Sequence, residues 1–306
     1  MNNNELIKIK SELICNGIIH NNCSDKAYNI EHKTQIRRTS NMGLQLFLND
    51  DIIVSIPYDK INENSKYYLI ENDGAFYLTD GINKISVSLT RVATYKCYDY
   101  ELDNKKKISE YIQKEGKNTL ICSISNSCCY FSKNEQCAFC ALNKGININE
   151  DDRIEMISKA FQIILKEDNS IKSINLTGGN LYTEDRGLFQ YIKILKAIRS
   201  VSNIPVAVEI SPPEDLELLK VLKDEGATAI EFNVEIWDEK IRKIIMPGKA
   251  MIKREYYIKA WKKAVELFGI GNVGSGIIIG LENTKSSLEG IKAMIEVRML
   301  TFNYPI

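Results

Sequence analysis

Five of the eight cysteines fall within nineteen residues, and this cluster is the part of the chain best suited to chemistry. They stand at positions 122, 128, 129, 137 and 140. A thiolate is a soft ligand that suits zinc or an iron–sulfur cluster, and clustered cytosolic cysteines more often bind metal than form disulfides. The spacing of Cys137 and Cys140 lets two sulfur atoms converge on one centre. A third sulfur would come from Cys128 or Cys129.

Two kinds of metal site are compatible with these cysteines alone. One is a [4Fe–4S] cluster with three protein thiolates and one open iron. The other is a four-cysteine zinc knuckle that would use Cys122 as well. The two histidines, His20 and His32, are far from the cluster in the sequence. Their position argues against a Cys/His zinc site and against acid–base catalysis by histidine.

The composition is that of an ordinary globular protein and excludes several classes of partner. The 306 residues contain 40 Lys and Arg against 40 Asp and Glu, so the balance does not favour nucleic acid. No stretch approaches the roughly 18 apolar residues that cross a bilayer, and the polar start lacks the apolar core of a signal peptide. We therefore expect a cytoplasmic protein without a membrane or nucleic-acid partner.

Two different patterns divide the chain before residue 118. Residues 1–40 are polar and weakly patterned, and we expect them to form a separate N-terminal segment. Between 43 and 100, short apolar runs alternate with turns such as Asn72-Asp73-Gly74 and Asp80-Gly81, which supply the positive φ angles of hairpins. We expect a small antiparallel β-rich domain plus a charged linker or helix over residues 41–117.

Six apolar runs alternate with helical patterns after residue 118, and this alternation predicts an α/β fold with a parallel sheet. The expected strands are 119–124, 174–176, 206–210, 229–234, 276–279 and 300–304. A barrel and a doubly wound sheet both fit this pattern, and in either fold ligands bind at the carboxyl edge of the strands. Because the cysteine cluster directly follows the first of these strands, we expect it at that edge.

The cysteine cluster resembles the motif of the radical S-adenosylmethionine (SAM) superfamily. That motif has three cysteines at spacings of three and two, with an aromatic residue before the last, and Phe139 with Cys140 matches its end. The spacing departs from the motif, since eight residues separate Cys128 from Cys137. We favour Cys128 over Cys129 because the segment 128–131 resembles the Cys-x-aromatic-aromatic of one poorly characterised branch, encoded near nitrilase-like genes.

Downstream residues extend the resemblance over about residues 119–306 and imply where SAM binds. Gly178 and Gly179 resemble the Gly-Gly-Glu motif, whose backbone holds the methionine amino group, with Asn180 in place of the glutamate. Asn233 and Glu235 match positions that bind the ribose hydroxyls in biotin-synthase-like members, and two residues apart on a strand they would share one face.

Three further positions complete the implied SAM site. Arg254 resembles the arginine that binds the methionine carboxylate, for which a guanidinium fork is well shaped. Ile278 resembles the apolar residue that packs on adenine, and the resemblance places Phe139 among the cofactor-binding residues. From the residues alone each position also has an ordinary structural interpretation: a tight turn, a satisfied polar pair, a solvated arginine or a core side chain.

The resemblance implies a partial (β/α)6 TIM-like barrel over residues 118–306 and an oxygen-sensitive enzyme. Its reduced cluster would cleave SAM to a 5′-deoxyadenosyl radical, which abstracts hydrogen from a small molecule or peptide; transfer of the aminocarboxypropyl group is the less common variant. A flavodoxin or ferredoxin would supply the electrons. Members of the similar branch continue further, so a C-terminal truncation and a natural short form both stay open. The competing hypothesis is a non-enzymatic zinc-binding scaffold.

Overall fold

The computed structural model describes residues 2–32, 44–50, 52–56, 64–89, 95–115, 118–125, 127–140, 142 and 150–305. The chain divides into two compact units, each with its own hydrophobic core. The first unit comprises residues 1–94 and 114–117, and the second comprises residues 95–113 and 118–306. The chain thus changes unit after residues 94, 113 and 117, whereas we expected a single boundary between the β-rich domain and the barrel, after residue 117.

The first unit contains an antiparallel five-stranded sheet in the order β2-β1-β5-β4-β3. Its strands are β1 (Leu44–Leu48), β2 (Ile52–Ile56), β3 (Tyr68–Asn72), β4 (Ala75–Thr79) and β5 (Lys84–Leu89). The β3–β4 hairpin turns at Asp73 and Gly74, which have φ angles of 52° and 79°. This is the turn that the Asx-Gly pair predicted, because both residue types tolerate a left-handed backbone.

Two helices also belong to this unit, although we expected residues 1–40 to form a polar segment of their own. They are α1 (Asn3–Asn16) and α2 (Asn22–His32). A capping box between Asn2 and Glu5 begins α1. Leu6 and Leu13 are buried in the core that includes the sheet residues. A few apolar residues at helical spacing therefore suffice to pack a largely polar helix.

The second unit is built on a seven-stranded sheet in the order β12-β11-β10-β9-β8-β7-β6. Its strands are β6 (Ile112–Glu115), β7 (Thr119–Ser123), β8 (Ser173–Thr177), β9 (Val206–Glu209), β10 (Ala229–Glu231), β11 (Val273–Ile279) and β12 (Leu300–Pro305). From β7 to β12 every neighbouring pair is parallel. The strands keep chain order, whereas a doubly wound sheet reverses it at a switch point.

This order confirms the predicted partial barrel of six β/α units, and the sheet is open, with β6 and β12 at its edges. We expected a charged linker or helix before residue 118, but residues Ile112–Glu115 form the strand β6. Its neighbour Tyr111 and its first residue Ile112 are buried, so tertiary packing outweighs the local charge there.

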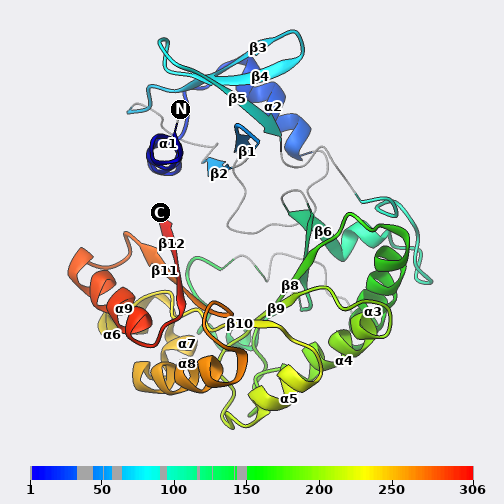
Figure 1. Cartoon of the computed structure of the whole chain (residues 1–306). Helices are drawn as coiled ribbons and strands as arrows, with labels where there is room; N and C mark the ends of the chain where they lie inside the picture. Colours follow the sequence, from blue (N-terminus) through cyan, green and yellow to red (C-terminus); the bar gives the residue numbers. More distant parts are fainter. Residues whose placement is uncertain are drawn as a thin grey trace. The chain divides into compact units, whose positions relative to one another are not determined.

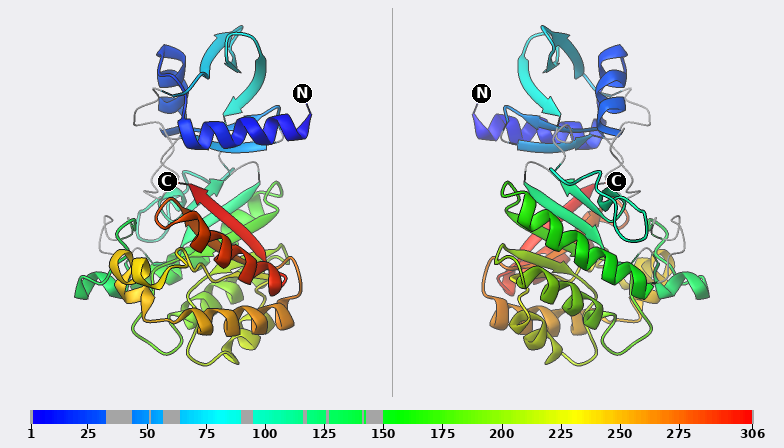
Figure 2. Two further views of the ribbon diagram at one scale, coloured as in Figure 1. Left: turned by 90° about the vertical axis from the view of Figure 1, so that its left-hand side faces the viewer. Right: turned by 90° about the vertical axis from the view of Figure 1, so that its right-hand side faces the viewer.

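Helices surround the curved sheet of this unit on its outer side (Figure 1). They are α3 (Glu150–Glu167), α4 (Leu188–Arg199), α5 (Leu218–Asp224), α6 (Glu239–Ile245), α7 (Pro247–Ala250), α8 (Arg254–Phe268) and α9 (Thr284–Glu296). At one edge, β12 runs along α9 (Figure 2). No helix in the part of the chain that the structure describes is long and apolar enough to cross a membrane.

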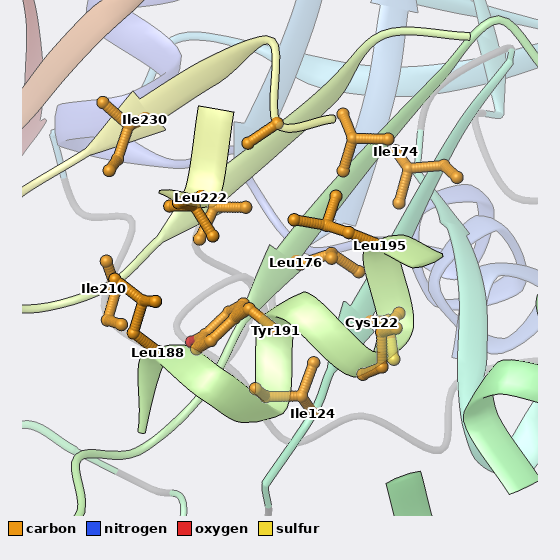
Figure 3. Packing of buried hydrophobic residues seen from close by; sticks show 14 of the residues in the cluster. Cys122, Ile124, Ile174, Leu176, Leu188, Tyr191, Leu195, Ile210, Leu222 and Ile230 are labelled. Atoms are coloured by element: carbon orange, nitrogen blue, oxygen red, sulfur yellow. The ribbon is translucent and has the colours of Figure 1, made fainter. Parts of the chain in front are cut away.

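The largest core lies between the strands and these helices. Alternate strand residues such as Cys122, Ile174 and Leu176 are buried in the same cluster as Leu188 and Tyr191 of α4 (Figure 3). Their neighbours along each strand are less buried and point to the opposite side of the sheet. The outer side of the sheet therefore supplies stability, and its inner side and carboxyl edge are left for polar residues.

Two adjacent residues of α4 test this division. Leu188 is fully buried, and Phe189 is 52% exposed. Leu188→Ala is expected to lower the free energy of unfolding by about 2–5 kcal/mol because it leaves a cavity. Phe189→Ala is expected to change it by less than about 0.5 kcal/mol. Urea unfolding followed by circular dichroism measures both, and equal losses would contradict the assigned core.

Candidate active site

The cysteine cluster lies on the segment that leaves β7 at the carboxyl edge of the sheet. The chain passes Cys128, forms a 3-10 helix over Cys129–Lys133, and turns at Asn134, whose φ angle is 57°. It then reaches Cys137 and Cys140. All four cysteines of this segment are free and half-buried. We call residues 127–140 the cysteine loop.

One side of the cysteine loop packs against the turn that follows β8. A Cβ atom on Gly179 would lie 1.9 Å from the carbonyl oxygen of Ser127 and 2.7 Å from the Cβ of Cys128. The backbone N–H of Cys129 donates a hydrogen bond to the carbonyl oxygen of Asn180 at 2.8 Å. Glycine is therefore required here by the cysteine loop itself, whereas we had expected it to make room for the ligand.

The other side of the loop is attached to α6 and α7. The N–H of Ala138 donates to the carbonyl oxygen of Ile245 at 2.7 Å, and that of Gly248 donates to the carbonyl oxygen of Glu135 at 2.9 Å. The buried ring of Tyr130 fills the space over Gly248, where a Cβ atom would lie only 2.3 Å from the ring. The two contacts hold the loop between the β8 turn and α7.

The thiols of Cys128, Cys137 and Cys140 influence one another. Burial, together with the nearby Cys140, Glu235 and Cys128, raises the pKa of Cys137 to about 11 against the opposing effect of Lys249. Burial and Cys128 also raise the pKa of Cys140. Cys128 is therefore close enough to act electrostatically on both other thiols.

Cys129 has different surroundings. Burial and the neighbouring Cys128 raise the pKa of its thiol to about 12, whereas Arg186 lowers it. Neither Cys137 nor Cys140 is among the groups that act on Cys129 most strongly. The pKa of the Cys129 thiol therefore depends on Cys128 and Arg186 more than on the pair that ends the loop.

The cysteines of the loop are the type of residue that binds an iron–sulfur cluster, because they offer several thiols on one short segment. Within the described residues, no three His, Cys, Asp or Glu side chains already stand in positions that could hold a metal ion. Deprotonation of the buried thiols would accompany binding, since metals bind the thiolate form.

A buried ion pair lies beside the cysteine loop. The Lys249 Nζ atom is 2.9 Å from Glu235 Oε1, and the two side chains are only 13% and 14% exposed. Burial alone would lower the pKa of Lys249, but the charges of Glu235 and Cys137, with the phenol of Tyr257, outweigh it and raise the pKa. The ammonium group is therefore charged at neutral pH.

The buried guanidinium of Arg242 holds the backbone on both sides of this pair. It donates to the carbonyl oxygens of Val234 and Ile236, which flank Glu235, and to those of Lys249 and Ile252, at 3.0 to 3.3 Å. Its planar fork satisfies several carbonyl groups that would otherwise be buried without partners. Arg242 thereby fixes the segment after β10 relative to α7.

The predicted strand at residues 229–234 is shorter than we expected, because β10 ends at Glu231. The side-chain amide of Asn233 donates to Glu209 Oε1 at 2.8 Å, and its oxygen accepts the N–H of Gly276 at 2.7 Å. Glu235 follows with a left-handed φ of 64°. The two residues therefore do not share a strand face, and each already has a protein partner.

The remaining predicted site residues lie in three different surroundings. Asn180 is buried and donates to the hydroxyl of Ser211 at 2.9 Å. Phe139 is exposed. Ile278 is half-buried near the end of β11, where its N–H donates to the carbonyl oxygen of Glu235.

Arg254 is not placed at the cysteine loop by its contacts. Its Nε atom lies 3.2 Å from Glu239 Oε1, its Nη1 atom donates to the carbonyl oxygen of Trp237 at 3.3 Å, and its guanidinium stacks over the Trp237 ring. Lys249, rather than Arg254, is among the groups whose charge acts most strongly on Cys137 and Cys140.

Two carboxylates inside the barrel were missed by the sequence reasoning. Glu209 and Glu231 end β9 and β10 and are direct neighbours in register. Burial, followed by the charges of Glu209 and Glu235, raises the pKa of Glu231 from its ordinary 4.5 to about 7. The available signal was a glutamate at the last position of each apolar strand, on the face opposite the core residues.

Comparison with known protein families gives a match that covers more than half of the chain. Residues 126–295 match the family model described as the Radical SAM superfamily. The match begins just before Cys128 and extends through α8 and β11 into α9, so it contains the cysteine loop and most of the barrel.

Individual proteins of similar sequence or structure give further matches. Bacteriochlorophyllide c C-7(1)-hydroxylase of Chlorobaculum limnaeum is 32% identical over 107 residues, 34% of this chain and 26% of its own length. An uncharacterised protein of Methanocaldococcus jannaschii is 25% identical over 225 residues, 72% of this chain and 54% of its own. Methylornithine synthase is a similar solved structure, 16% identical with a TM-score of 0.46 over 61% of this chain and 53% of its own. The chain spans about half or less of the curated relatives.

The close contact at Gly179 can be tested against its neighbour. In Gly179→Ala the new methyl group would collide with backbone and Cβ atoms of the cysteine loop, and we expect a loss of most of the iron bound after anaerobic reconstitution. In Gly178→Ala the nearest atom, at 2.9 Å, is the side-chain Cγ1 of Ile124, which can shift, so the loss should be smaller. Equal iron content in Gly179→Ala and wild type would refute the contact.

The raised pKa of Glu231 predicts a pH-dependent stability. A carboxyl group whose pKa is higher in the folded state stabilises the fold below its unfolded pKa, near 4.5, and this contribution is lost as the pH rises through about 7. When the pH is raised from 5 to 8, the free energy of unfolding of the wild type should fall by on the order of 1–3 kcal/mol more than that of Glu231→Gln. Urea unfolding at both pH values measures this, with the exposed Glu289→Gln as the control that should follow the wild type.

Proposed function

Because this chain belongs to the radical SAM superfamily of enzymes, whose members use a [4Fe–4S] cluster and SAM, we propose that it binds both at the carboxyl edge of its partial barrel. The observation that carries the proposal is the position of the cysteine loop. The loop follows β7 at the edge where the parallel strands end, it carries Cys137 and Cys140, whose pKa values both depend on Cys128, and it lies directly against the Gly178–Gly179 turn.

Cys128, Cys137 and Cys140 are the proposed cluster ligands. The effect of Cys128 on the pKa values of both other thiols supports this choice. Cys129 is the weaker candidate, because neither Cys137 nor Cys140 is among the groups that act on its pKa most strongly. Three protein ligands leave one iron open, as the chemistry of this superfamily requires.

When bound, the two cofactors supply the proposed reaction, in which SAM is reductively cleaved and the 5′-deoxyadenosyl radical abstracts hydrogen from a small-molecule or peptide substrate. The chain's own residues would hold the cofactors in place and exclude water. Buried Tyr130 closes the loop on one side, and the Gly178–Asn180 backbone closes it on the other. Few acid–base groups are needed, in agreement with the two histidines of the sequence. A flavodoxin or ferredoxin is the proposed source of electrons.

The proposed SAM contacts are the backbone of Gly178 and Gly179 with Asn180, the ribose partners Asn233 and Glu235, the carboxylate partner Arg254, and the apolar Ile278 with Phe139. Glu235 and Arg254 are already ion-paired, to Lys249 and Glu239. Each group keeps unused hydrogen-bonding capacity, since within the described residues the ion pair uses only Oε1 of Glu235 and the contacts of Arg254 use only its Nε and Nη1 atoms. SAM would therefore bind beside the existing partner at each of these positions.

Anaerobic reconstitution with iron and sulfide tests the proposal. We expect a brown protein with four irons per chain and broad absorbance near roughly 400 nm that dithionite bleaches, and 5′-deoxyadenosine on addition of SAM. Cys137→Ala and Cys140→Ala should each abolish the cluster and the product.

Cys128→Ala and Cys129→Ala form the matched pair. The first should lose the cluster, and the second should retain most of it. The opposite result would make Cys129 the ligand. A colourless wild-type protein that binds one zinc ion tightly and no cluster would overturn the enzyme proposal as a whole.

A further inference from the structure

The Lys249–Glu235 pair is unusual because both charges are nearly buried beside a metal-ligand loop. Removing two charges from water costs several kcal/mol per ion, and their attraction often does no more than balance that cost. The left-handed backbone of Glu235 adds strain, since residues other than glycine seldom adopt it. Stability alone is therefore a poor reason for this pair.

The fold places the pair next to the cysteine loop and keeps it there. Gly248, which precedes Lys249, donates to the carbonyl oxygen of Glu135 and supports the ring of Tyr130. Glu235 is fixed by backbone hydrogen bonds to Gly276 and Ile278. Both ends of the pair thus have a fixed position relative to the loop.

The two side chains place opposite charges beside the cysteine loop. The ammonium group of Lys249, the residue after the loop-bound Gly248, is positive, and the carboxylate of Glu235, 2.9 Å from it, is negative. A nearly buried charge beside the loop changes the energy of the electron that a bound cluster gains, because the interaction is Coulombic and water screens it little there.

We propose that Lys249 and Glu235 together set the reduction potential of the cluster that the cysteine loop holds. The positive ammonium favours the reduced cluster, which carries one more electron, and the carboxylate partly cancels this effect. The inference rests on the proposed function, because it requires the cluster. Net charge near an iron–sulfur cluster is one of the determinants of its potential.

The test is a redox titration of reconstituted protein without SAM, followed by electron paramagnetic resonance of the reduced cluster. A dithionite-buffered mediator supplies the one electron. In Lys249→Met, we expect the ratio of reduced to oxidised cluster at a fixed potential to fall about tenfold, equivalent to a midpoint about 59 mV more negative. In Glu235→Gln, the ratio should rise, since the ammonium is then uncompensated.

The charge-free double variant Lys249→Met/Glu235→Gln is the decisive control. It should return the midpoint potential toward the wild-type value. If the pair had only a structural role, the midpoint of the double variant should differ from the wild type at least as much as that of either single variant. Lys249→Arg keeps the charge and should stay near the wild type. If Lys249→Met does not retain a cluster, Glu235→Gln and the double variant still show the direction in which the midpoint potential moves.

The two proposals fail in different ways. A wild-type protein that forms no cluster overturns the proposed function. A wild-type cluster whose midpoint is the same in Lys249→Met and Glu235→Gln, or moves in the same direction in both, overturns only the inference. Iron content and far-ultraviolet circular dichroism of each variant show that the compared proteins are folded and loaded.

Discussion

The absence of a side chain at Gly179 is the constraint on which the site depends. The carbonyl oxygen of Ser127 occupies the space that a Cβ atom would need, so the backbone of the turn after β8 is in direct contact with the loop after β7. This contact joins two neighbouring β/α units at their carboxyl edge. The position of the cysteine loop is therefore determined by packed backbone atoms, which are stiff, and not by long side chains, which are flexible.

A second restraint acts from the opposite side and is polar. Arg242 binds carbonyl groups of the segment after β10 and of the region around α7, and α7 in turn binds the cysteine loop. Glu235, Lys249 and the loop consequently form one connected assembly. The cost of burying the guanidinium is offset by hydrogen bonds to carbonyl groups that the short segments cannot satisfy among themselves.

The sequence predicted the repeating part of the fold well, because six apolar runs separated by helical patterns leave few alternatives. It also predicted the place of the cysteine loop, which follows from chain order alone. It failed for β6, where burial of Tyr111 and Ile112 outweighs local charge, and for Asn233, whose hydrogen bonds to β9 and β11 end the strand early. Glu209 and Glu231 were missed because the sequence pattern does not show that the side chains at the ends of neighbouring strands lie close together and are partly buried. Such errors are typical where tertiary contacts, which the sequence pattern does not reveal, determine the local structure.

The packing of Tyr130 on Gly248 has a consequence for how this sequence can change over time. The aromatic ring fits only where residue 248 has no Cβ atom, and the two positions are 118 residues apart in the chain. Any larger residue at 248 would require a smaller one at 130. Related sequences are therefore expected to vary at these two positions in concert, with total side-chain volume rather than residue identity preserved.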